Sequence, residues 1–139
     1  ALGHQQALGR YARQFAEREH VGLLAYSPLA QGYLTGKYQG GARPPGARTT
    51  LFERAQRYEQ PEVEQAISAY LALARDIGVD PAQLAIAFVT SRPFVTSNII
   101  GATTMAQLKT DLASVEFAIT PEIERRIDAI HAVHSNPAP

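Results

Sequence analysis

Cysteine is absent from the 139-residue sequence, which excludes disulfide bonds and thiolate metal sites. No apolar segment reaches the roughly 18 residues needed to cross a membrane, and the start does not resemble a signal peptide. Charge of one sign is not in excess either, because 13 Lys and Arg residues balance 13 Asp and Glu residues. The basic patch with which proteins bind nucleic acid or a membrane surface is therefore missing. We expect a cytoplasmic protein with a small ligand and with neither a nucleic-acid nor a membrane partner.

Hydrophobic residues make up 45% of the chain and charged residues 19%, which is ordinary for a globular protein with one core. The length corresponds to one domain or less. The chain starts at Ala1, and its only methionine is Met105. We therefore expect that a preceding part has been removed or that the chain is a piece of a longer protein.

The first half of the chain predicts a helix, a strand and a long loop. Residues 5–20, QQALGRYARQFAEREH, repeat apolar side chains at the helical spacing. The run VGLLAY at 21–26 predicts a strand directly after this helix. Glycines and prolines interrupt residues 31–60, so we expect an irregular loop there. Loops of this length inside a domain are usually functional.

Two helices follow the loop. Pro61 at a first-turn position and a regular apolar face predict a helix that ends near Gly78. Asp80, followed by Pro81 and then by Gln83, predicts the start of a second helix with a capping box.

The last part of the chain predicts a strand and two more helices. The run SNIIGA at 97–102 predicts a short buried strand. Thr104 is the expected N-cap of the next helix, with Gln107 three residues later. We expect four apolar side chains on the inner face of this helix, namely Met105, Leu108, Leu112 and Val115. Thr120 is expected to cap the last helix, and the tail at 135–139, SNPAP, is expected to be disordered.

This order of elements belongs to the alternating α/β class. Two strands alone cannot form a sheet that is buried on both faces. A (β/α)8 TIM barrel takes roughly 250 residues, so this chain has room for about its last quarter to half. We therefore expect the C-terminal portion of such a barrel, with about two of its strands and their helices.

Both junctions between a strand and the following segment carry polar groups. In parallel α/β folds, ligands bind at the carboxyl ends of the strands, and helix N-termini there attract phosphate. The run SNIIGATT and the helix after it fit this plan, and YSPLAQG with the later Lys37 fits a pyrophosphate. The alternative is structural: Ser27 and Pro28 would then only stop a strand, and Thr104 would only cap a helix. Spacing alone leaves both interpretations open.

The runs LLAYSPLAQGYLTGKY and SNIIGATTMAQLKTDL together resemble the C-terminal part of the aldo-keto reductases. The resemblance covers about residues 21–139 and is greatest to the Tas-like and potassium-channel β-subunit-like branches. It implies a (β/α)8 barrel that binds NADP(H) at the C-terminal face of its strands. Residues 21–26 would be the seventh strand and 97–101 the eighth. Residues 1–139 would then form the C-terminal part of a single NADP-dependent oxidoreductase domain.

The resemblance also implies which residues bind the cofactor. The segment after the seventh strand would line the nicotinamide and the pyrophosphate with Tyr26, Ser27, Pro28, Leu29, Ala30 and Gln31. Lys37 would meet the pyrophosphate, and Arg48 matches a loop arginine that lies over the cofactor. The adenosine-phosphate site would include Gly101, Thr103, Gln107 and Asp111.

Two of these positions depart from the family pattern. Asp111 stands where relatives usually carry asparagine, and its charge would repel phosphate. Gln107 stands where many relatives carry an arginine that pairs with the 2′-phosphate of NADP(H). A neutral amide brings no charge to that site, so the preference for NADPH over NADH is left open.

The resemblance supplies no catalytic residue. The family's Asp, Tyr, Lys and His set, in which the tyrosine is the general acid, comes from the first half of the barrel. We expect no metal site either, because His131 and His134 share a helix face but lack a third ligand.

Three functions fit the sequence. The chain could be the cofactor-binding part of an NADP(H)-dependent aldo-keto reductase that reduces aldehydes or ketones, a non-catalytic NADP(H)-binding regulatory protein, or an inactive truncated product. The expected partners are a nicotinamide cofactor and a small carbonyl substrate. Because the edges of a partial barrel are exposed, we also expect the isolated chain to be poorly stable or to self-associate.

Overall fold

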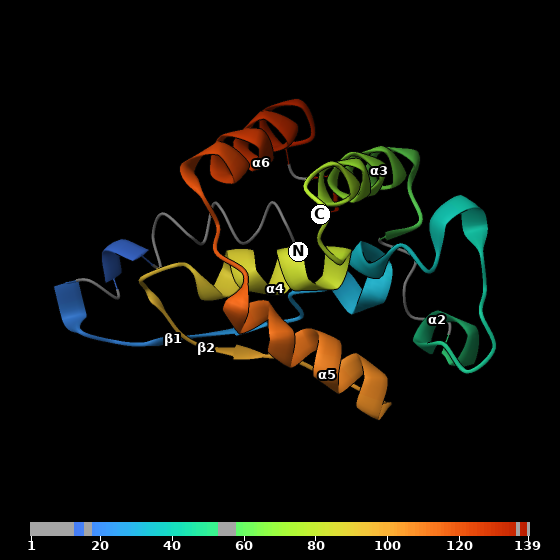
Figure 1. Cartoon of the computed structure of the whole chain (residues 1–139), viewed down its shortest axis with the longest axis horizontal. Helices are drawn as coiled ribbons and strands as arrows, with labels where there is room; N and C mark the ends of the chain where they lie inside the picture. The colour runs from blue at the N-terminus through green and yellow to red at the C-terminus, as the bar shows by residue number, and fades with distance from the viewer. Residues whose placement is uncertain (1–12, 16–17, 53–57, 136, 139) are drawn as a thin grey trace.

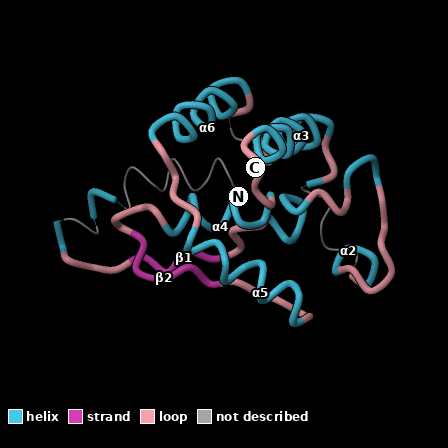
Figure 2. Tube along the Cα trace, in the orientation of Figure 1, coloured by secondary structure: helices cyan, strands magenta, loops and turns pink. Residues whose placement is uncertain are grey.

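The computed structural model of the chain describes residues 13–15, 18–52, 58–135 and 137–138. This described part of the chain is a helix-rich α/β structure with two strands, β1 (Leu23–Tyr26) and β2 (Val95–Ile99) (Figures 1 and 2). The predicted helix at 5–20 lies mostly outside the described residues.

The two strands are parallel neighbours, with Tyr26 opposite Ile99. Both predicted strands exist, but β1 begins two residues later than predicted, and β2 covers 95–99 instead of 97–102. The prediction that the second strand is buried is wrong. Helix α4 (Pro81–Thr90) packs against β2, and the side chains on the other face of the sheet are exposed. Leu24 and Ile99 are 60% and 51% exposed because nothing among the described residues covers that face.

Helix α3 (Pro61–Asp76) confirms the predicted helix and its proline in the first turn. It buries Val63, Ile67 and Leu71 on one side. Asp80 caps α4 as predicted, but its carboxylate accepts from the Ala82 amide at 2.8 Å. The predicted capping box with Gln83 is therefore not formed, because such a box requires the cap to bond the third helical residue instead of the second.

The described residues of the segment at 31–60, namely 31–52 and 58–60, are more regular than the predicted irregular loop. The segment contains the 3-10 helices η1 (Ala30–Thr35) and η2 (Gln39–Gly41) and the short helix α2 (Arg48–Leu51). Its aromatic side chains pack against α3 in one core cluster, formed by Ala30, Tyr33, Leu34, Tyr38, Tyr58, Val63, Ile67, Leu71 and Ala138. Ala138, in the tail expected to be disordered, is only 3% exposed in this cluster.

A second core cluster joins α3, α4 and α6 (Pro121–Val133). Ile123 and Ile127 are buried on α6, and the Thr120 hydroxyl accepts from the Ile123 amide, so the last predicted helix and its cap are confirmed. No helix in the described part of the chain is long and apolar enough to cross a membrane.

Helix α5 (Met105–Ala113) and the 3-10 helix η4 (Ser114–Glu116) follow β2. The capping box of Thr104 and Gln107 is confirmed. The predicted inner face is wrong, because Met105, Leu112 and Val115 are 67%, 56% and 74% exposed. The apolar stripe points away from α4, and the residues buried on this segment are Asp111 and Ser114.

Candidate ligand site at the ends of the strands

The carboxyl ends of β1 and β2 lie at the same edge because the strands are parallel and Tyr26 pairs with Ile99. In Figure 1, both strands run toward the end of the molecule where α2 and the first turn of α5 lie. The chain leaves this edge through the turn at 27–32 and through the segment at 100–104. Parallel α/β folds bind their ligands at this position.

The turn after β1 is strained. Ser27, Ala30 and Gln31 have positive φ values of 58°, 49° and 58°, and Gly32 has a φ of 96°. Only glycine adopts this region without strain, and each other residue costs roughly 1 kcal/mol or more. Such outliers cluster at functional sites, although their presence alone does not define a function. The sequence contains only one glycine in this turn and did not reveal the strain.

Residues of the same turn differ in exposure. The Tyr26 ring is 71% exposed at the end of β1, whereas Pro28 and Ala30 are buried. Backbone hydrogen bonds hold the turn, among them one from the Ala30 amide to the Ser27 carbonyl at 3.0 Å and one from the Gly32 amide to the Leu29 carbonyl at 2.9 Å. A rigid turn thus places an exposed aromatic ring at the edge of the sheet.

Lys37 lies against this turn. A Cβ atom at Gly32 would be 2.9 Å from Lys37 Cε and 3.0 Å from its Nζ. The ammonium group also lies 5.1 Å from the centre of the Tyr38 ring. The structure therefore brings a positive charge to the strained turn, where the charge could meet a phosphate group.

Gly101 leaves open space at the second strand end. A Cβ atom there would meet no other atom of the described residues within 4 Å, so their packing does not require glycine at this position. Open space of this kind allows a ligand to approach the backbone.

The start of α5 is held by Gln107. Its Oε1 atom accepts from the Thr103 amide at 2.9 Å, the Thr103 hydroxyl at 3.0 Å and the Thr104 amide at 3.3 Å. These groups were predicted to be available to phosphate, and the structure shows them bonded to Gln107. The Gln107 amide nitrogen, which takes part in none of these bonds, is the group that could donate to a phosphate.

Asp111 lies one turn further along α5 and is 4% exposed. Burial raises the pKa of its carboxyl group, and the nearby charge of Asp80 raises the pKa further. Thr103 and Gln107 are exposed, so the structure does not bring Asp111 to the open surface where they lie.

Arg48 is the exposed first residue of α2. Among the described residues, no hydrogen bond or ion pair joins it to the other candidate residues. Its neighbour Thr49 is held by a 3.5 Å hydrogen bond from its amide to the Tyr38 hydroxyl. The structure therefore places Arg48 at the same end of the molecule without bringing it into contact with the strained turn.

A group that the sequence analysis missed lies at the base of the segment containing Lys37 and Arg48. Glu59 Oε1 accepts from the Tyr33 hydroxyl at 3.0 Å and lies 2.6 Å from Arg43 Nη2. The hydrogen bond from Arg43 lowers the pKa of Glu59. Burial, and then the bond to Glu59, raises the pKa of Tyr33 to about 12. No short-range spacing could have revealed this group, because its members lie far apart in the sequence.

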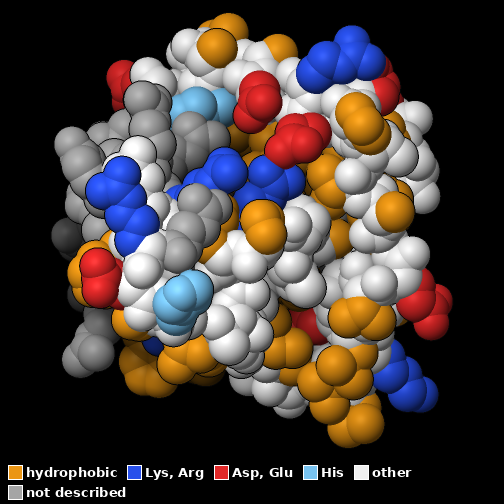
Figure 3. All heavy atoms as spheres, turned by 90° about the vertical axis from the view of Figure 1, so that its left-hand side faces the viewer, with side chains coloured by type: hydrophobic (Ala, Val, Ile, Leu, Met, Phe, Trp, Pro, Cys, Tyr) orange, Lys and Arg blue, Asp and Glu red, His pale blue; other side chains and the backbone are white. Residues whose placement is uncertain are grey.

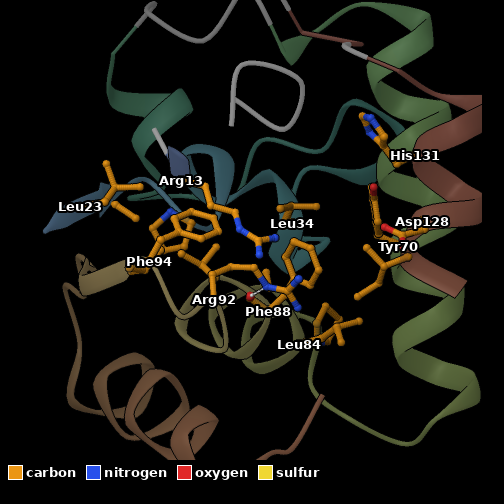
Figure 4. Close-up of a pocket in the computed structure, with 17 residues that line it drawn as sticks. Arg13, Leu23, Leu34, Tyr70, Leu84, Phe88, Arg92, Phe94, Asp128 and His131 are labelled. Carbon is orange, nitrogen blue, oxygen red and sulfur yellow. Dashed lines mark hydrogen bonds between the residues drawn. The ribbon is translucent and has the colours of Figure 1, made fainter. Parts of the chain in front are cut away.

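A cavity of about 330 Å³ lies on the helix-covered face of the sheet, not at the strand ends. Figure 4 shows Arg13, Arg92 and Phe88 on one side and Tyr70 and His131 on the other. Of the candidate cofactor residues, only Pro28 lines this cavity. The cavity is therefore not part of the predicted site.

Charges at the opposite end of the molecule do not form a field of one sign. Figure 3 shows the side from which the strands start, and basic side chains there lie next to acidic ones. Arg92, for example, pairs with Glu124 at 2.5 Å. Among the described residues, no three His, Asp or Glu side chains are close enough to hold a metal ion.

Comparison with known proteins places the chain in a family. Residues 5–132 match the model described as the aldo/keto reductase family. The chain is 48% identical over 126 residues to Protein tas of Escherichia coli, covering 91% of this chain and 36% of that protein. It is 37% identical to a putative voltage-gated potassium channel subunit beta of Schizosaccharomyces pombe, covering 78% of this chain and 33% of that protein. An uncharacterized oxidoreductase of Mycobacterium tuberculosis is 36% identical, with 88% and 37% covered. The chain thus spans about a third of the length of these relatives.

Proposed function

Because the chain belongs to the aldo/keto reductase family, we propose that it supplies the cofactor-binding part of an NADP(H)-dependent oxidoreductase that reduces aldehyde or ketone groups. The observation that carries this proposal is the arrangement at the strand ends. There, Lys37 lies against the strained turn after β1, and Gly101 leaves open space after β2. NADPH, when bound, would supply the hydride.

We assign a role to each group at this edge. The exposed Tyr26 ring would lie against the nicotinamide, and the turn from Ser27 to Gln31 would border the nicotinamide and pyrophosphate. Lys37 would pair with the pyrophosphate as a point charge. The amide nitrogen of Gln107 would donate to the 2′-phosphate, and Arg48 would reach the cofactor if α2 moves toward it.

The chain is proposed to be the C-terminal part of a (β/α)8 barrel that contains strands seven and eight. Its described surface supports this, because Leu24 and Ile99 on the sheet and Leu112 on α5 are more than half exposed. Burying the exposed part of each of these side chains against neighbouring elements of a complete barrel would contribute roughly 1–1.5 kcal/mol, about half of the value for full burial. The length ratio to the relatives also supports a longer polypeptide.

The general acid would come from the part of the polypeptide that precedes this chain. Accordingly, we nominate no catalytic residue among residues 1–139. The isolated chain is expected not to oxidise NADPH in the presence of an aromatic aldehyde. Saturable, protein-dependent oxidation by the isolated chain would contradict this division of roles.

A second candidate function is a non-catalytic, NADP(H)-binding regulatory subunit. The similarity to a protein named as a potassium channel subunit beta favours it. The two candidates share the cofactor site and differ in turnover. An aldehyde reductase assay on the natural full-length polypeptide distinguishes them.

The test of the cofactor site is NADPH binding to the full-length polypeptide, followed by fluorescence. Lys37→Ala should weaken NADPH binding about tenfold, because one charge-assisted hydrogen bond contributes about 1.5 kcal/mol. Arg125→Ala, which removes an exposed cation from α6, is the matched control and should leave binding unchanged. Equal affinities for Lys37→Ala and the control would contradict the assignment of Lys37.

A further inference from the structure

The segment from Tyr33 to Glu59 is closed at its base by one carboxylate oxygen. Glu59 Oε1 accepts from the Tyr33 hydroxyl at 3.0 Å and pairs with Arg43 Nη2 at 2.6 Å. Tyr33 lies in η1, Arg43 follows η2, and Glu59 lies two residues before the start of α3. A single side chain thus joins three parts of the chain that are distant in sequence.

Aromatic packing strengthens the same base. The Tyr33 ring centre lies 4.7 Å from that of Tyr38 and 5.3 Å from that of Tyr58. These three rings are at most 7% exposed. Aromatic pairs at such separations add roughly 0.5–1.5 kcal/mol each beyond the burial of their area.

The segment is also tied along α3. The Gly40 amide donates to Glu64 Oε1 at 3.2 Å, and Gln39 Nε2 donates to Ser68 Oγ at 3.4 Å. Between these ties and Glu59 lies α2, which the Tyr38 hydroxyl holds through the Thr49 amide. The base of the segment is therefore fixed, while Arg48 lies on its exposed part.

We propose that Glu59 is a positioning residue for nicotinamide-nucleotide binding, because it holds the base of the segment that carries Lys37, against the strained turn, and Arg48, at the same end of the molecule. The proposal rests on the proposed function of the site. Glu59 does not touch the strained turn in the structure, so it acts through the residues that it joins. The carboxylate matters because its charge pairs with Arg43 while the same oxygen accepts from Tyr33.

The experiment compares NADPH affinity and dissociation rate in the full-length polypeptide with and without Glu59→Ala. This variant should bind NADPH about fivefold more weakly, mainly through faster dissociation, because a displaced segment releases the bound nucleotide more readily. Glu122→Ala is the matched control, since it removes a carboxylate that pairs with Arg125 on α6. The control should bind NADPH as the wild type does.

A measurement on the double variant distinguishes an effect of Glu59 on the position of Arg48 from an effect on the stability of the whole protein. If Glu59 acts by placing Arg48, then Glu59→Ala should have a clearly smaller effect on NADPH affinity in an Arg48→Ala background. A fivefold loss that is the same in both backgrounds would overturn the role assigned to Arg48 placement. If Glu59→Ala does not fold, Tyr33→Phe removes only the hydroxyl and should still weaken NADPH binding by roughly two- to threefold.

Different results refute NADPH binding by the protein and the positioning role of Glu59. A wild type that does not bind NADPH refutes the proposed function. A wild type that binds NADPH, together with a folded Glu59→Ala variant of unchanged affinity, refutes the positioning role alone.

Discussion

Replacement of Asp111 by asparagine should stabilise the protein at neutral pH. The carboxyl group is 4% exposed, and both its burial and the charge of Asp80 raise its pKa. Asparagine has the same shape without the charge, so it avoids the cost of keeping a buried carboxylate ionised. A buried polar group without full compensation costs about 1–3 kcal/mol, and we expect a gain near the lower end, about 1 kcal/mol at pH 7.

The effect should depend on pH with a defined sign. Because the pKa of Asp111 is raised in the folded state, the folded protein binds the proton more tightly than the unfolded chain. Below pH 3.9, roughly the pKa of an aspartate in the unfolded chain, Asp111 is protonated in both states and does not destabilise the fold. As the pH rises through the higher pKa of Asp111 in the folded protein, its ionisation destabilises the fold. The advantage of Asp111→Asn should vanish toward roughly pH 3 and grow toward neutrality.

Urea titration of the protein at several pH values measures this difference. Glu116→Gln is the matched control, because it makes the same change of acid to amide at an exposed position after α5. The control should stay within about 0.5 kcal/mol of the wild type at each pH. A lower free energy of unfolding for Asp111→Asn at pH 7, or a gain in that free energy that does not change with pH, would contradict the claim that burial and the charge of Asp80 disfavour the ionised form of Asp111.

Three further predictions concern the segments around the site. Gln107→Ala removes the acceptor of three hydrogen bonds at the start of α5 and should cost about 1 kcal/mol in a urea titration; an unchanged midpoint would argue against the capping box. Gln31→Gly relieves a φ of 58° and should raise the free energy of unfolding by about 0.5 kcal/mol or more, whereas a loss would contradict the left-handed conformation. The pKa of Glu59 is lower in the folded protein than in the unfolded chain. The stability that its charge contributes is therefore present above the pKa of the unfolded chain and is lost as the pH falls through the pKa of the folded protein. The difference between wild type and Glu59→Gln should therefore shrink toward roughly pH 3, and a constant difference would speak against the pair with Arg43.

Elements defined by local signals could be predicted from the sequence. Helices α3 and α6 have a proline in the first turn and a regular apolar face, and both form as predicted. The cap of α5 is equally local, because Thr104 and Gln107 are three residues apart. These signals need no knowledge of distant parts of the chain.

Features that depend on distant contacts could not be predicted. The short helices within 31–60 are held by contacts such as the bond from Tyr33 to Glu59, across 26 residues. The apolar stripe of α5 was recognised, but its inner face was assigned wrongly because α4 packs on the other side, where Asp111 is buried. Periodicity identifies an apolar face without identifying the element that covers it.

At the candidate site, too, the features that depend on distant contacts could not be predicted from the sequence. The sequence indicated both strand-end segments, but not that Lys37 lies against Gly32 or that the turn adopts positive φ values at non-glycine residues. It also suggested two roles for Gln107, as a helix cap and as a phosphate ligand. The structure shows Oε1 engaged in the cap, which leaves the amide nitrogen for the second role.

Hydrogen exchange of the protein with and without NADPH tests most directly whether the nucleotide binds at the strand ends. Bound NADPH should slow amide exchange at residues 27–37 and 100–107, while exchange in α6 should not change. Protection confined to the residues around the cavity between α4 and α6, or no protection at the strand ends when NADPH is bound, would contradict the proposed site.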